Sequence, residues 1–163
     1  MWGRLTAVVV VAVLLAGCGG DDAVSEVTGQ TSCVETQSTL NGPALASDVP
    51  FTSVDITYDC DYTLSDERVS GSGPAVARVD MSVDGDTRVG QISGTVVISN
   101  EGGTWEGTVS GTTTWTTTNP AHAHDMDAVY LGTGGYEGLR FVMTNEGMDM
   151  SDLTTTGRIE PAD

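Results

Sequence analysis

Polar and apolar residues alternate along most of the chain from Pro50 onward, a pattern typical of β-strands with one buried face. In segment 55–64 every even position is apolar, aromatic or cysteine, and every odd position is Asp or Thr. The same two-residue period predicts further strands at 75–83, 92–98, 104–118, 126–131, 136–144 and 153–159, with a short one around 68–71. These make about eight strands, and no segment after the first apolar run has the 3.6-residue period of an amphipathic helix.

Glycines interrupt these strands in a repeated motif. The sequence aromatic-Glu-Gly occurs at Trp105–Gly107 and again at Tyr136–Gly138. Glycine inside a strand marks a bulge or a sharp bend, and closed sheets need such bends. We therefore expect both motifs to be corners of one barrel. The fold predicted for residues 49–163 is all-β, a single antiparallel β-barrel of about eight strands.

Alternation also assigns residues to the barrel interior. The predicted candidates for lining an internal ligand site are Trp105, Val109, Trp115, Tyr136, Leu139, Phe141 and Met143. Glycines at 107, 111 and 138 lie between these large side chains, which predicts uneven filling and a pocket. The alternative is ordinary tight packing, in which the aromatics close over the glycines.

The first residues have the features of an export signal: Arg4, an apolar run from Leu5 to Ala16, and then Cys18. The run is about twelve residues, whereas a spanning helix takes roughly 20. The sequence Leu-Ala-Gly-Cys at 15–18 resembles the lipobox of bacterial lipoproteins. That resemblance implies removal of a signal peptide, residues 1–17, and a diacylglyceryl group with palmitate-like acyl chains on Cys18.

Two acyl chains anchor a protein stably to a membrane, so Cys18 is the predicted membrane contact. The predicted location is the bacterial cell envelope: the outer face of the plasma membrane, or the outer membrane of a two-membrane bacterium. Residues 18–48 are rich in Gly, Ser, Thr and Asp and lack periodicity. They are predicted to be a lipidated tether and loop, and Cys33 is expected to tie down their second half.

Export bears on the two remaining cysteines, Cys33 and Cys60, because disulfides persist outside the cytoplasm. We predict that they pair, with two free thiols as the alternative. Cys-x-x-Cys spacing, as in redox or zinc sites, is absent.

The chain is strongly acidic, with 23 Asp and Glu against six cationic side chains. Removing residues 1–17 takes one arginine and no acid, which leaves five arginines and a net charge of −18. Nucleic acid is excluded as a partner by such a charge, and anionic lipid surfaces are unfavourable.

Candidate catalytic and metal-binding residues are few. His122 and His124 would share one face of a strand and could chelate Zn²⁺ or Cu²⁺ with a neighbouring carboxylate. The alternative is a polar loop at a barrel end, and we predict no metal site. Glu106 and Glu137 occupy matching places in the repeated motif, but alternation puts Glu106 outside. No nucleotide or cofactor motif is present, and we expect no cofactor.

Four segments resemble a known family: "SDERVSGSG" (65–73), "GGTWEGTVSG" (102–111), "GTGGYEGLRF" (132–141) and "TGRIEP" (156–161). They are similar to bacterial proteins with an allene oxide cyclase-like, or dirigent-like, β-barrel. The similarity covers residues from about 51 to the C-terminus. It implies an eight-stranded antiparallel barrel that holds a small apolar molecule, and no catalytic residue of the family is matched here.

Three functions follow as hypotheses. The first is a lipid-tethered barrel that binds a small apolar or aromatic molecule. The second is a structural or interaction lipoprotein with a filled barrel, and the third is a cyclase or isomerase. Interior volume separates the first from the second, whereas a buried titratable group at the base of a cavity would favour the third.

Overall fold

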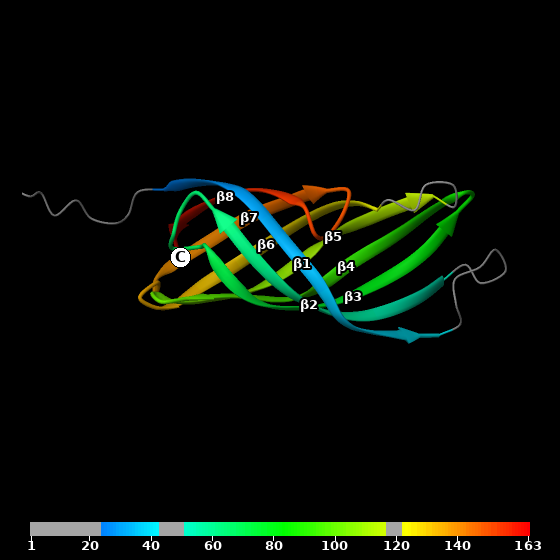
Figure 1. Cartoon of the computed structure of the whole chain (residues 1–163), viewed down its shortest axis with the longest axis horizontal. Coiled ribbons are helices and arrows are strands. Elements are labelled where there is room, and N and C mark those ends of the chain that lie inside the picture. The colour runs from blue at the N-terminus through cyan, green and yellow to red at the C-terminus, as the bar shows by residue number, and fades with distance from the viewer. Residues whose placement is uncertain (1–23, 43–50, 117–121) are drawn as a thin grey trace, which may run out of the picture.

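The computed structural model describes residues 24–42, 51–116 and 122–163, in which eight antiparallel strands form a closed barrel (Figure 1). The strands are β1 (Ser25–Asn41), β2 (Phe51–Leu64), β3 (Gly71–Asp84), β4 (Thr87–Asn100), β5 (Gly103–Thr116), β6 (Ala123–Gly134), β7 (Leu139–Gly147) and β8 (Leu153–Pro161). Each strand pairs with the next, and β8 pairs with β1. The predicted all-β barrel is therefore confirmed. The described part of the chain has no helix that is long and apolar enough to cross a membrane.

Two of the predicted elements are corrected by the structure. Strand β1 occupies Ser25–Asn41, inside the segment 18–48 that was predicted to be tether and loop, so the barrel begins before residue 49. The sequence pattern does not reveal this strand because most of its side chains are polar and exposed. Pairing with β2 and β8 holds it in place. The short strand predicted at 68–71 is instead the turn between β2 and β3, with β3 starting at Gly71. The predicted signal peptide and the predicted lipidation site, Cys18, lie outside the described residues.

Strand β1 closes the ring over only part of its length. Its residues 25–31 pair with β8, whereas residues 29–41 pair with β2. The Cys33 N–H donates to the Met150 carbonyl at 2.7 Å, and a bulge follows between Glu35 and Gln37. Bulges bend a strand and increase its twist. Consistently, β1 runs diagonally across the barrel and ends away from β8 (Figure 1).

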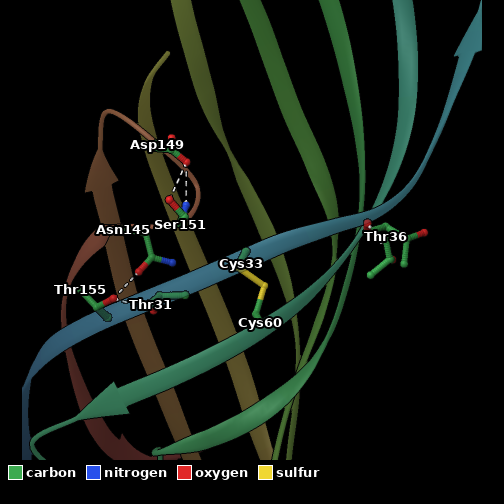
Figure 2. The surroundings of a disulfide bond; sticks show 9 residues. Thr31, Cys33, Thr36, Cys60, Asn145, Asp149, Ser151 and Thr155 are labelled. Carbon is green, nitrogen blue, oxygen red and sulfur yellow. Dashed lines mark hydrogen bonds between the residues drawn. A yellow bond between two sulfur atoms is a disulfide. The ribbon is translucent and has the colours of Figure 1, made fainter. Parts of the chain in front are cut away.

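The predicted disulfide is confirmed: Cys33 of β1 and Cys60 of β2 are directly opposite in the ladder and bonded (Figure 2). Their sequence separation is 27 residues, for which the chain-entropy account gives a stabilisation of roughly 3–4 kcal/mol. The bridge thus fixes β1 to the barrel close to the point where it leaves the ring.

One end of the barrel, which we call the plugged end, is filled by aromatic side chains and covered by the β2–β3 turn. Trp105 stacks on Tyr136 with ring centroids 5.0 Å apart and meets the Phe141 ring edge-on at 6.2 Å. The Trp105 indole N–H donates to the Arg68 carbonyl at 2.7 Å, and Val69 beside it is fully buried. The aromatic polar atoms are thus paired while the rings pack tightly.

Asn100, at the end of β4, ties this cover together. Its Nδ2 donates to the carbonyls of Arg68 and Ser70 at 3.0 and 2.9 Å. Its Oδ1 accepts from the Tyr136 hydroxyl at 2.6 Å. One side chain therefore links the β2–β3 turn, the β4–β5 hairpin and the β6–β7 turn.

The two aromatic-Glu-Gly motifs are not equivalent corners, contrary to prediction. Trp105–Gly107 lies within β5, whereas Tyr136–Gly138 lies in the turn between β6 and β7, where Gly138 has φ 84°. Gly107 also leaves no empty space: a Cβ there would collide with the Val129 carbonyl and lie 2.9 Å from the Tyr130 Cα. Such glycines allow β5 and β6 to approach closely, so they do not create the predicted pocket.

Candidate functional site

A cavity of about 540 Å³ opens at the end of the barrel opposite the plugged end. This volume falls within the range of roughly 300–1,000 Å³ typical of small-molecule sites. Its mouth is formed by the far ends of β5 and β6, the loop between β7 and β8, and the bulged part of β1. We call this the open end.

The structure separates the seven residues predicted to line a ligand site. Val109, Trp115 and Met143 line the cavity. Trp105, Tyr136 and Phe141 belong to the plugged end, and Leu139 is partly buried against the core; none of these four lines the cavity. The predicted lining consists mainly of large aromatic and apolar side chains, whereas the cavity lies where some inward side chains, such as Ala75 and Ala77, are small.

The wall contributed by β2, β3 and β4 is mostly apolar, and its hydroxyl groups are those of Tyr58 and Tyr62 on β2. It was missed as a ligand surface although its alternation was recognised in the sequence. Its inward residues include Ile56, Ala75, Ala77, Val79 and Ile92. The two alanines leave room in front of β3 that longer side chains would fill. The signal that could have identified this wall is the short side chains within a buried period-2 strand.

The opposite wall, from β5 around to β1, carries polar side chains. Thr155 donates to the Asn145 Oδ1 at 2.6 Å, and the Thr31 and Thr155 hydroxyls are 2.7 Å apart (Figure 2). Because the Thr155 proton is used on Asn145, Thr31 must donate to Thr155. This relay orients the amide of Asn145, whose Nδ2 points away from Thr155.

Two further polar atoms on this wall have no hydrogen-bond partner in the part of the chain that the structure describes. Thr113 Oγ1 and His124 Nδ1 are buried and make no hydrogen bond to any described residue. Thr113 and His124 are directly opposite each other in the β5–β6 ladder. The unpaired hydrogen-bonding atoms of the described lining therefore lie on one side of the cavity.

Tyr62 and Tyr130 contribute hydroxyl groups deeper in the barrel. Burial raises the pKa of Tyr62 and raises that of Tyr130 well above its usual value. The two side chains lie close enough to influence each other's pKa, but the Tyr130 oxygen makes no hydrogen bond of acceptable geometry to a described residue. Both hydroxyls are consequently protonated at neutral pH and can act as hydrogen-bonding groups, not as bases.

The mouth combines aromatic and charged groups. The Trp115 ring stacks on His122 with centroids 4.7 Å apart, and His122 lies 6.0 Å from His124. Burial and, secondly, His122 lower the pKa of His124, with partial opposition from Asp149, so His124 is neutral at pH 7. Within the described ranges no three His, Cys, Asp or Glu side chains are arranged to hold a metal ion.

No protein-family model, no curated protein and no solved structure matches the chain. The likeness to allene oxide cyclase-like proteins therefore stays a prediction.

Proposed function

We propose that the protein is a membrane-tethered, exported lipoprotein whose barrel binds a small apolar or aromatic molecule. The observation that carries the proposal is the 540 Å³ cavity, closed below by the plugged end and open at the other. A guest that buries about 200 Å² of apolar surface would gain on the order of 5 kcal/mol before the costs of association. Trp115 and His122 offer flat rings at the entrance.

Binding is favoured over catalysis by the groups that line the cavity. The carboxylates among them, Glu35 and Asp149, are exposed residues of the mouth. The titratable groups deeper inside are Tyr58, Tyr62 and Tyr130, whose pKa values are raised by burial, and the buried imidazole of His124. Glu106 and Glu137 are exposed on the outer surface. A cyclase or isomerase would need an acid and a base that face each other inside, whereas the residues opposite His124 on the neighbouring strands, Thr113 and Gly147, have no titratable group. The open volume argues against a filled structural barrel.

The anchor part of the proposal is supported by the lipobox-like sequence at 15–18 and by the Cys33–Cys60 disulfide, which suits an oxidising compartment. Strand β1 begins at Ser25, seven residues after Cys18 and at the plugged end, where the Ser25 hydroxyl donates to Asp66. In the proposed arrangement the plugged end lies nearer the membrane and the mouth faces away from it. An unacylated, full-length mass for the membrane-extracted protein would refute the anchor.

Binding is tested with the neutral fluorophore N-phenyl-1-naphthylamine. We expect saturable binding to the wild type and an affinity at least about tenfold lower for Ala77→Leu, because leucine fills the space in front of β3. The matched control is Val76→Leu, since Val76 is adjacent on the same strand and exposed. Absence of saturable binding, or equal affinity for the two variants, would contradict the proposal.

A further inference from the structure

A band of polar side chains, which we call the polar arc, runs diagonally across three adjacent strands on one wall of the cavity. It consists of Thr113 on β5, His124 on β6 and Asn145 on β7. His124 is opposite Thr113, and Asn145 is opposite Met126, two positions along the same inward face from His124. All three residues are at least nine-tenths buried, with exposed fractions of 5%, 9% and 5%.

Each member presents a hydrogen-bonding atom that the described protein leaves unused. Thr113 Oγ1 and His124 Nδ1 are buried without a partner. The Asn145 Oδ1 accepts a hydrogen bond from Thr155, and the Asn145 Nδ2 makes no hydrogen bond to a described residue. Buried polar groups are paired in roughly 90% or more of cases, so the two unpaired atoms of Thr113 and His124 on adjacent strands are unexpected in a purely structural wall.

The three groups share one capability, the donation of a hydrogen bond. The Asn145 amide nitrogen can only donate, a threonine hydroxyl can donate, and neutral imidazole donates from Nδ1 in one tautomer. Opposite them lies the apolar wall with Ala77, Val79 and Ile92. A guest that satisfies both walls has an apolar body and one acceptor on its edge.

We propose that the polar arc recognises a neutral carbonyl oxygen on an otherwise apolar ligand. This inference rests on the proposed binding function and adds the chemical class of the guest. The carbonyl accepts from Asn145 and from Thr113 or His124, while its hydrocarbon part lies on the apolar wall.

The charges around the cavity favour a neutral guest over an anion. Glu35 and Asp149 stand at the mouth, and the whole chain carries a net charge of −17. The described lining residues include no Arg or Lys. Arg88, opposite Trp115 in the β4–β5 ladder, has a buried Nη1 that makes no hydrogen bond to a described residue, but Arg88 is not part of the lining. A carboxylate ligand would therefore pass two like charges and find no permanent cation along the wall.

The test compares 2-acetonaphthone with 2-ethylnaphthalene, which differ by one carbonyl in place of a methylene, and adds 2-naphthoate as the anionic probe. Affinities are measured by equilibrium dialysis for the wild type, Thr113→Val and Asn145→Leu. The controls are Thr112→Val and Thr144→Val, the outward-facing neighbours on the same strands. The readout is the ratio of ketone to ethyl affinity, which cancels general effects on the cavity.

We expect this ratio to fall at least about fivefold in Thr113→Val and in Asn145→Leu, and to change less than about twofold in the controls. Naphthoate should bind the wild type more weakly than the ketone. An unchanged ratio in both arc variants would overturn the carbonyl proposal, and so would tighter binding of naphthoate than of the ketone. In either case, binding of 2-ethylnaphthalene to the wild type would still support the proposed binding function. Failure of all three probes to bind the wild type would overturn both.

Discussion

The two ends of this barrel are built from the same strands but treat polar atoms in opposite ways. At the plugged end the Trp105 indole N–H and the Tyr136 hydroxyl are both hydrogen-bonded, and the rings around them are packed together. At the open end Thr113 and His124 are buried with unpaired polar atoms beside a cavity. Paired polar atoms and filled volume stabilise the first end, whereas the second keeps space and hydrogen-bonding capacity for a guest.

This difference indicates that the plugged end stabilises the fold and that the open end is available for binding. Trp105 and Trp115 show it most directly, because they lie on the same face of β5. Trp105 is fully buried beneath the β2–β3 turn, whereas Trp115 lies at the mouth and is only partly buried. Substitutions at the plugged end should therefore change stability, and substitutions at the open end should change binding.

The largest expected effect is that of Trp105→Ala. Removal of this buried ring leaves a cavity and takes one of two hydrogen bonds from the Arg68 carbonyl, so the free energy of unfolding should fall by about 3–5 kcal/mol. Trp115→Ala should cost less than about 1 kcal/mol while lowering the affinity for N-phenyl-1-naphthylamine. Urea denaturation followed by circular dichroism gives the stabilities, with exposed Glu106→Ala as the control. Equal losses for the two tryptophans would abolish the distinction between the ends.

Sequence reasoning identified the faces of the strands but not their levels in the barrel. Alternation put Trp105 and Trp115 on one face, yet ten residues at about 3.3 Å each separate them by roughly 33 Å along the strand. Which residues share a level depends on register and on barrel tilt, which are set by pairing between strands. The seven predicted lining residues were consequently divided between a plug and a cavity.

Strand β1 and the plug were missed for a related reason. The sequence of β1 is polar, and its strand conformation depends on partners at 51–64 and 153–161. Val69 is a single apolar residue in a turn, so no period could show that it is fully buried. The disulfide, by contrast, was predictable, because counting cysteines leaves one pair once Cys18 is set aside.

A moderate effect is expected at Asp66, which holds the plug in position. Its carboxylate accepts from the Arg68 side chain at 2.7 Å and from the Ser25 hydroxyl at 3.0 Å. Hydrogen bonds from Arg68 lower the pKa of Asp66 to about 2, against a smaller opposing effect of burial. The unfolded chain therefore takes up this proton first as the pH falls. The resulting stabilisation is complete well above pH 4 and is lost between about pH 4 and pH 2.

Asp66→Asn should accordingly lower the free energy of unfolding by about 1 kcal/mol at pH 7, after allowance for solvent screening at this partly exposed pair. The gap between variant and wild type should narrow as the pH approaches 2. Glu67→Gln, a change at the exposed neighbour, is the control. A gap that stays constant from pH 7 to pH 2 would show that the ionised carboxylate does not hold the plug.

The smallest change in stability is expected for Thr113→Val, and its sign distinguishes the open end from the plugged one. A hydroxyl buried without a protein partner contributes nothing to folding and costs desolvation, so its replacement by a methyl group should leave the free energy of unfolding unchanged or raise it by up to about 1 kcal/mol.

Thr112→Val, on the outward face, controls for the higher strand propensity of valine. The same substitution should lower the preference for the ketone probe, because a group kept for a guest is dispensable for the fold. A loss of more than about 1 kcal/mol relative to Thr112→Val, measured by urea denaturation, would mean that the Thr113 hydroxyl is engaged within the protein, and the contrast between the two ends would then fail at this residue.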